Sequence, residues 1–320
     1  MIRYTLFCVG IFLGMGSATA QEIQNTLSYR TIESDHYFRF NYENDLFFHT
    51  DYYYTQGVHF ELVHPALAKS FLHWLFPVFK SQANRYGIGL ESAGYTPTTI
   101  FADSILKGDR PFAGMAYLQA FAISNNPHNR SRLSSVISLG LMGPAAGGYE
   151  IQSFIHRYTG NPDPIGWKYQ VKNQVILNYE LNYEKAINSW NPHIQSSWTA
   201  MLRLGNLDTK AAAGAVFMAG IFDDPFKGNQ KPRHLFAYGY LHPQLELIGF
   251  DASLEGGPFT SGNPYTIDQA DLKRLLFRNQ MGVILGKDRL SIDISSRYLS
   301  PEFNSGKSHL TGGIALGISF

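Results

Sequence analysis

A short segment, residues 149–158, combines helical spacing with two side chains that could do chemistry. Its apolar residues recur at i, i+3, i+4 and i+7, as on one face of a helix, and they are Ile151, Phe154, Ile155 and Tyr158. Gln152 and His156 stand four residues apart, so the predicted helix presents them together beside this apolar stripe. Because an imidazole titrates near neutral pH, His156 could act as a general base. A surface histidine without a chemical role is the alternative, and the spacing alone leaves both open.

Two earlier segments hold further polar side chains of chemical interest. The first contains Asn44 and Asp45 and continues to Thr55, and the second contains Lys107 and Arg110. Neither segment defines a reaction by itself. Their meaning depends on whether the fold brings them to the same place as residues 149–158.

Several common chemistries lack their motifs in this sequence. The glycine-rich run 143–148 is not followed by the Lys-Ser or Lys-Thr pair of a phosphate-binding loop, and no Gly-x-Ser-x-Gly elbow supports a serine nucleophile. Cys8 is the only cysteine, and it lies in the first twenty residues. The net charge is +1 and charged residues make up 16% of the chain, which argues against nucleic acid as a partner.

The first twenty residues have the layout of a secretory signal peptide. Arg3 gives a short positive region, residues 6–14 an apolar region, and Ala18 to Ala20 a small-residue cleavage site. The apolar run is too short for a membrane anchor. We therefore expect residues 1–20 to be removed, which leaves residues 21–320 without a cysteine, and hence without a disulfide, a thiol nucleophile or a cysteine metal site.

The rest of the chain repeats segments of about ten residues in which polarity alternates, as in transmembrane β-barrels. No apolar stretch after the signal approaches the roughly 20 residues of a membrane helix. Strands are expected around 38–43, 58–62, 84–95, 114–124, 132–142, 175–187, 194–206, 211–221, 234–254, 272–286, 289–299 and 308–320. With aromatic residues at 14%, enough for interfacial girdles as well as a core, the sequence predicts an all-β fold. That fold is a transmembrane antiparallel barrel of about 12 strands with a short extracellular loop helix.

The last strand strengthens this prediction. Ile314, Leu316, Ile318 and the terminal Phe320 alternate with small residues. Such a strand, ending in an aromatic residue, is typical of the segment that outer-membrane barrels present to the barrel assembly machinery. The alternative is the final strand of a soluble sandwich, which the signal peptide and the aromatic content disfavour.

An even strand number would place both chain ends in the periplasm and the three polar segments on one extracellular rim. Short, turn-like connections at 125–131, 188–193 and 286–288 would then be periplasmic. Residues 65–82 break this pattern and suggest an interfacial helix at the inner rim. Continuing the alternation of the first strand puts Asn44 on the lipid-facing side, where a polar residue needs a reason.

Taken in order, these motifs resemble the lipid A 3′-O-deacylase family of outer-membrane barrels. The matching pieces are Asn44-Asp45, Tyr54-Thr55-x-Gly57, Gly108-Asp109-Arg110-x-Phe112-Ala113, Gly143-Pro144-x-Ala146-Gly147-Gly148-x-Glu150-x-Gln152 and His156-Arg157, with Trp167 eleven residues after the histidine. The resemblance spans essentially the whole mature chain.

The resemblance implies a calcium-dependent esterase in the bacterial outer membrane, with its active site facing the cell exterior. Its substrate would be lipid A of lipopolysaccharide, from which it would remove the acyl or acyloxyacyl group at the 3′ position. By the same resemblance His156 would be the general base that activates water, and Asp45 would help to hold Ca²⁺. Asn44 and the ion would stabilise the oxyanion, and Thr55 and Gln152 would complete the polar site.

The sequence departs from the family pattern at one position. The pattern has a glutamate six residues after the histidine, and here that residue is Pro162. Asp163 and Glu150 are the other candidate carboxylates for the metal. Lys107 and Arg110 are candidates for binding the phosphates of lipid A. The alternative for Arg110 is a structural pair, with Asp109 or with a neighbouring strand.

Two other functions fit part of these observations. A phospholipase-like barrel would use the same histidine and calcium on glycerophospholipids. A non-catalytic structural barrel or pore would use the polar segments only to organise its loops. About twelve strands leave an interior that side chains can largely fill, which argues against a wide channel.

Overall fold

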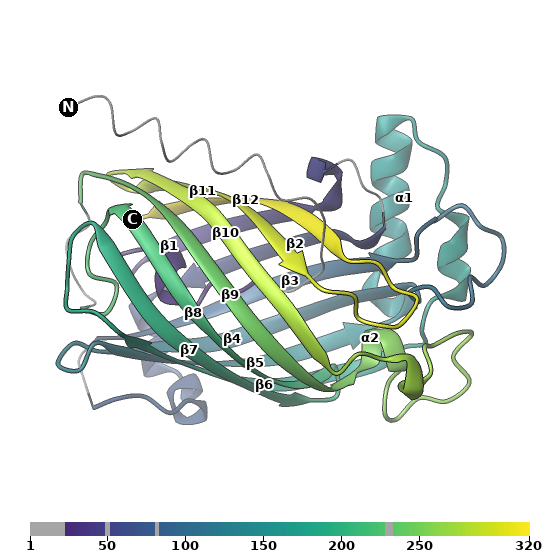
Figure 1. Ribbon diagram of the computed structural model, residues 1–320, viewed down its shortest axis with the longest axis horizontal. Coiled ribbons are helices and arrows are strands. Elements are labelled where there is room, and N and C mark those ends of the chain that lie inside the picture. Colours follow the sequence, from purple (N-terminus) through teal and green to yellow (C-terminus); the bar gives the residue numbers. More distant parts are fainter. Residues whose placement is uncertain (1–22, 49–51, 81–82, 228–232) are drawn as a thin grey trace.

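The chain forms a closed antiparallel barrel of twelve strands in which β1 pairs with β12 (Figure 1). The computed structural model describes residues 23–48, 52–80, 83–227 and 233–320, so the predicted signal peptide, residues 1–20, lies outside the described residues. The strands are β1 Tyr37–Asn44, β2 Tyr53–Val63, β3 Asn84–Thr96, β4 Ala113–Asn126, β5 Ser131–Met142, β6 Gln174–Ala186, β7 Ile194–Gly205, β8 Asp208–Ile221, β9 Leu235–Asp251, β10 Leu275–Lys287, β11 Leu290–Leu299 and β12 His309–Ser319. The predicted fold class and strand number are confirmed.

Alternating polarity is what makes these segments strands of a barrel. In β1, Phe38 is exposed on the outer surface, whereas Arg39, Asn41 and Glu43 are buried in the interior. Successive side chains of a strand point to opposite faces, so one face of each strand meets the surroundings and the other fills the lumen. Among the described residues, no helix is long and apolar enough to cross a membrane.

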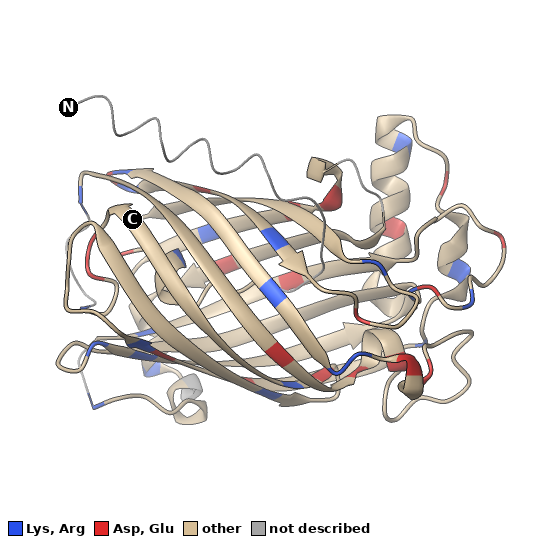
Figure 2. Ribbon diagram, in the orientation of Figure 1, with Lys and Arg blue, Asp and Glu red and all other residues tan. Residues whose placement is uncertain are grey.

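Charged side chains fill much of the lumen, and several of them form ion pairs there. Figure 2 shows charged residues on the strands as well as in the loops. Arg297 of β11 forms a two-pronged pair with Glu43 of β1, and Arg278 of β10 lies 3.0 Å from Glu246 of β9. Removing one member of a buried pair costs about 3–5 kcal/mol, because the other charge stays buried without its partner. These pairs join strands that are adjacent in the barrel or one strand apart.

The residues before β1 pass inside the barrel. Residues 23–30 are all buried. Asn25 donates to Glu61 of β2 over 2.6 Å, the Ser28 amide donates to Glu184 of β6 over 2.9 Å, and Arg30 Nε donates to Asp293 of β11 over 2.6 Å. Contacts to strands on different sides of the barrel make this segment a plug, which we call the N-terminal plug, residues 23–31.

The connections divide between the two rims. Connections β1–β2, β3–β4, β5–β6, β9–β10 and β11–β12 gather at one end, which we call the loop rim, together with α1 (Gly148–Thr159) and α2 (Ala252–Glu255) (Figure 1). The opposite end holds short turns at 127–130 and 288–289. The predicted loop helix at 149–158 is α1 and is confirmed. The interfacial helix expected at 65–82 is instead two 3₁₀ helices, η4 (Pro65–Lys69) and η5 (Phe71–Leu75), because Ser70 between them has extended backbone.

Deleting residues 23–31 should open the lumen to ions. The full chain should give no steady conductance in planar bilayers, whereas the deletion variant should conduct, because the plug no longer bridges strands across the barrel. Heat-modifiable mobility on gels checks that the variant still forms a barrel. A full chain that conducts as well as the deletion variant would show that the plug does not close the lumen.

Candidate functional site

Helix α1 lies on the outer face of the barrel wall at the loop rim. A Cβ added at Gly148 of α1 would lie 3.1 Å from the Gly114 Cα of β4 and 2.7 Å from Trp167 Cη2. Met115, the next residue of β4, belongs to the buried interior. Adjacent residues of a strand point to opposite faces, so Gly114 faces outward. Two glycines therefore let the helix backbone touch the wall directly.

Trp167 joins this helix to the wall. Its indole is almost fully buried and packs on the Phe112 ring at 5.3 Å between centroids. It belongs to η7 (Ile165–Tyr169), and its Nε1 donates a hydrogen bond to Gln152 Oε1. A Cβ added at Gly94 of β3 would lie 3.8 Å from both the Trp167 ring and Thr55 Cγ2. Gln152 thus binds this indole directly, and Thr55 and the indole both lie close to Gly94.

A β-bulge turns Thr55 to the outer face. The register between β2 and β3 shifts between Tyr54 and Gln56, so Thr55 is the extra residue. The outward Cβ position of Gly94 would touch both Gln56 and Thr55, at 3.6 and 3.8 Å. Bulges re-aim side chains in this way next to functional sites. The Thr55 hydroxyl lies 3.4 Å from the hydroxyl of Thr96, a neighbour that the sequence did not single out.

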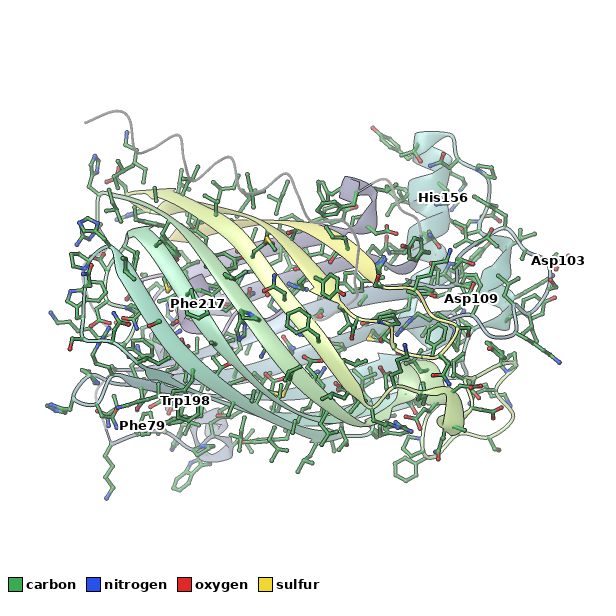
Figure 3. The ribbon with its side chains drawn as sticks, viewed as in Figure 1. Phe79, Asp103, Asp109, His156, Trp198 and Phe217 are labelled. Carbon is green, nitrogen blue, oxygen red and sulfur yellow. The ribbon has the colours of Figure 1, made fainter. Side chains whose placement is uncertain are left out.

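The two faces of α1 have the opposite arrangement from a helix on a soluble protein. Its polar residues Gln152, Ser153 and His156 are buried, whereas Phe154 is 65% and Tyr158 87% exposed. The polar face lies against the wall, and the predicted apolar stripe points away from it. Figure 3 shows His156 on α1 at the loop-rim end of the molecule.

His156 is held by a main-chain carbonyl. His156 is only 8% exposed, and its Nδ1 lies 2.6 Å from the main-chain oxygen of Pro162. A carbonyl oxygen can only accept, so Nδ1 carries the proton and, in the neutral ring, Nε2 carries the lone pair. His156 is therefore in the tautomer of a base that acts through Nε2. The ring also lies 6.4 Å from the Phe101 ring, measured between centroids.

Asn44 faces outward, as strand parity predicts, and its environment supplies the reason for a polar residue there. The turn η3 (Asp45–Phe48) folds back over the outer face of β12, where Phe47 covers Gly312. Asn44 Oδ1 accepts from the Leu46 amide over 2.7 Å, and Asn44 Nδ2 donates to the Tyr42 hydroxyl over 3.1 Å. Asn44 is buried by this turn rather than exposed to lipid.

Asp45 is the buried carboxylate of the first loop. It is 1% exposed, and its Oδ2 accepts from the Tyr52 amide over 2.7 Å. This bond closes the loop between β1 and β2. Asp45 is thus a buried carboxylate directly after Asn44, and carboxylate oxygens are ligands that hard cations such as Ca²⁺ prefer.

The other candidate carboxylates have different positions. Asp163 accepts from the Ser153 hydroxyl over 2.8 Å and from the Tyr149 hydroxyl over 2.9 Å, and these hydrogen bonds, in that order, lower the pKa of Asp163. Glu150 is exposed in the first turn of α1. Within the described part of the chain, no group of three or more His, Cys, Asp or Glu side chains could hold a metal ion. A cation at Asp45 would need amide, hydroxyl, main-chain or water oxygens for the rest of its shell.

Arg110 is buried and has a structural role, whereas Lys107 is exposed. The Arg110 guanidinium is 1% exposed, forms an ion pair with Glu302, donates to Ser253 Oγ over 2.7 Å, and lies 4.2 Å above the Tyr95 ring. This burial favours the structural alternative for Arg110 over phosphate binding, although its partner is Glu302 and not Asp109. Lys107 is exposed on the loop rim.

Comparison with known proteins decides the family. The model of the family described as "Outer membrane protein LpxR" matches residues 6–320. The chain belongs to the LpxR family of outer-membrane proteins. The match confirms the family to which the sequence motifs pointed, and with the twelve-stranded barrel it places the chain in the outer membrane.

A solved structure agrees with this fold. LpxR from Salmonella typhimurium matches with a TM-score of 0.73 at 17% identity, over 89% of this chain and 100% of that chain. The β domain of the Bordetella autotransporter BrkA matches with a TM-score of 0.44 at 10% identity, over 90% of this chain and 100% of that one. No curated protein matched the sequence. At 17% identity the likeness to the Salmonella structure shows the fold alone.

Replacing Gly148 by alanine should loosen α1. Alanine favours a helix over glycine by about 0.5–1 kcal/mol, so propensity alone predicts a firmer helix. The 2.7 Å approach to Trp167 predicts the reverse, because the added methyl group must push the helix or the indole away. Amide hydrogen exchange in α1 should become faster in detergent micelles, whereas Gly239→Ala in β9, whose added Cβ would meet only one atom at 3.7 Å, should leave it unchanged. Slower exchange in the Gly148 variant would contradict the contact.

Proposed function

We propose that this chain is an outer-membrane lipid A deacylase that hydrolyses the ester of the 3′-linked acyl or acyloxyacyl group. The observation that carries the proposal is His156. It is a buried imidazole in the Nδ1–H tautomer, held on the outward face of the barrel wall at the loop rim. A lipid in the outer leaflet reaches that face from the membrane, without entering the lumen.

The polar residues proposed for the site suit ester hydrolysis. In the proposed reaction His156 Nε2 takes a proton from water while the water oxygen attacks the acyl carbonyl carbon. The tetrahedral intermediate carries a negative oxygen, for which the Asn44 amide is the proposed donor. As the intermediate collapses, the bond from carbon to the sugar oxygen breaks, and the proton on Nε2 passes to that oxygen. In the proposal Thr55 and Gln152 complete the polar lining, Gln152 as the acceptor of the Trp167 Nε1 hydrogen bond.

Apolar side chains surround the same face and suit the acyl chains of the substrate. Phe154 and Tyr158 of α1, Phe101 of the β3–β4 loop and Leu46 of η3 are all exposed. The outward residues of β4 and β5 below them, such as Leu118, are exposed as well. The apolar face of α1 thus continues the apolar belt of the barrel. Lys107 is the proposed contact for a lipid A phosphate, because it is an exposed cation in the connection between β3 and β4.

We propose Ca²⁺ as the cofactor, anchored by Asp45. Bound there, the ion would supply positive charge for polarising the ester carbonyl. The chain itself contributes the buried carboxylate of Asp45, the first residue of η3, which follows Asn44 directly. The hydrogen bond from the Tyr52 amide fixes the position of this carboxylate. Glu150 and Asp163 have weaker support as ligands, Asp163 because both of its oxygens already accept hydrogen bonds from α1.

The alternative functions have less support. A pore would need an open lumen, and the N-terminal plug and buried ion pairs occupy it. A phospholipase would use the same base, so the choice of lipid is an outcome of the experiment below. For biogenesis, we propose that the barrel assembly machinery recognises β12, whose Leu316, Ile318 and the following Phe320 are exposed in a row.

Substituting His156 by glutamine should abolish deacylation, because glutamine keeps a similar size and polarity but cannot accept the proton from water. Mass spectrometry of lipid A from cells expressing the wild type should show loss of the 3′-linked acyl group, and cells with His156→Gln should keep it. His128→Gln, in the exposed turn between β4 and β5, is the matched control and should behave as wild type. Intact lipid A in wild-type cells refutes the proposal, and loss of acyl chains from glycerophospholipid instead favours the phospholipase.

Removing calcium should lower activity, and adding it back should restore it. Purified protein treated with EDTA should lose most of its lipid A hydrolysis and regain it with Ca²⁺. Asp45→Asn keeps the side chain's shape but removes its charge, so it should raise the Ca²⁺ concentration needed for half-maximal rate by roughly 10-fold or more. Full activity in EDTA would contradict a role for the ion.

A further inference from the structure

The segment after α1 turns back and runs along the helix. Gly160 ends α1 in the left-handed conformation, with φ of 76°, and the Asn161 amide donates to the His156 carbonyl over 2.8 Å. Pro162 and Asp163 then lie beside the helix, and Trp167 reaches Gln152. We call residues 160–167 the return strap.

The return strap contacts one face of α1 at successive turns. The Pro162 oxygen accepts from His156 Nδ1, and the Asp163 carboxylate accepts from Ser153 and Tyr149. Tyr149, Ser153 and His156 stand at i, i+4 and i+7, which places them in one row on the helix. Two adjacent residues of the strap therefore bind three positions of that row.

The backbone of the return strap is stiffened at this point. Pro162 has a fixed φ and restricts Asn161 before it to extended backbone, and Pro164 restricts Asp163 in the same way. The carbonyl of Pro162 thus belongs to a short segment with few alternative conformations. A stiff acceptor holds the imidazole in one orientation better than a flexible side chain would.

We propose that Pro162 and Asp163 position His156 for catalysis. The Pro162 carbonyl fixes the Nδ1–H tautomer, and Asp163, bound to Ser153 and Tyr149, keeps that carbonyl against the helix. A main-chain oxygen then does what a side-chain carboxylate does in many hydrolytic sites. Asp163 is a positioning residue: it acts through the Pro162 carbonyl, which in turn holds His156. This role rests on the proposed function of His156.

Nitrogen-15 spectra of histidine-labelled protein in detergent micelles test the tautomer without any reaction. The His156 signals, assigned by their loss in His156→Gln, should show a protonated Nδ1 and an unprotonated Nε2. Asp163→Ala should turn this single tautomer into a mixture. Asp103→Ala, which removes another exposed carboxylate of the loop rim, should leave it unchanged. An Nε2–H tautomer in the wild type, or an unchanged one in Asp163→Ala, would overturn the proposal.

Kinetics on purified lipid A separate positioning from binding. Asp163→Ala should lower kcat by roughly 10- to 100-fold and leave KM nearly unchanged. The expected loss in kcat is smaller than that for removing a general base, because the base itself remains. Asp163→Asn keeps one carbonyl oxygen as an acceptor and should recover part of the loss. A rise in KM with kcat unchanged would mean that Asp163 binds substrate and would refute positioning.

A mutant cycle tests whether Asp163 affects His156 through Tyr149 and Ser153. If Asp163 acts through its two donors, Tyr149→Phe with Ser153→Ala should match the loss in Asp163→Ala, and combining all three changes should add nothing further. Fully additive losses would contradict this route. If the wild type does not hydrolyse lipid A, the proposed function fails while the nitrogen-15 result still decides whether the strap fixes His156.

Discussion

The close contact between α1 and the barrel wall is the constraint on which the proposed site depends. Gly148 meets Gly114 with no side chain between the two backbones, and Trp167 fills the adjacent space. At this distance the face of α1 that continues from Gly148 must turn to the wall, and that face carries Gln152, Ser153 and His156. The remaining face is apolar and exposed, and we propose that it meets the membrane. One contact between two glycines therefore sets both the burial of the polar residues and the exposure of the apolar ones.

The lumen complements this arrangement. Buried ion pairs such as Glu43 with Arg297, together with the N-terminal plug, make the barrel a filled support and not a passage. A rigid wall is a suitable base for a site that must hold a helix, a bulge and a turn in register. Asn44 and Thr55 belong to the ends of β1 and β2, so both are fixed by the barrel while α1 is fixed by a loop. The proposed reaction on lipid would then take place outside the barrel, on the side that faces the membrane.

Much of the fold could be predicted from the sequence because alternation along a strand is a local pattern. The same pattern placed Asn44 on the outer face, and helical spacing placed α1. Contacts between distant segments could not be predicted in this way. Arg110 has the residue type of a phosphate ligand, yet Glu302, far along the chain, buries and pairs it. The bulge at Thr55 depends on pairing with β3, and the bond from His156 to Pro162 uses a main-chain oxygen that every residue carries, so neither has a signature in the sequence.

If the proposed site opens to lipid, the face of α1 opposite His156 must lie in the membrane. The mature chain is expected to lack cysteine, so a spin label at Phe154→Cys would report on this face alone. In vesicles, the label should collide frequently with oxygen, which concentrates in the bilayer, and rarely with a water-soluble nickel chelate, whereas a label at Ser104→Cys should show the reverse. Frequent collision of the Phe154→Cys label with the nickel chelate would place the helix in water and contradict a site that takes its substrate from the membrane.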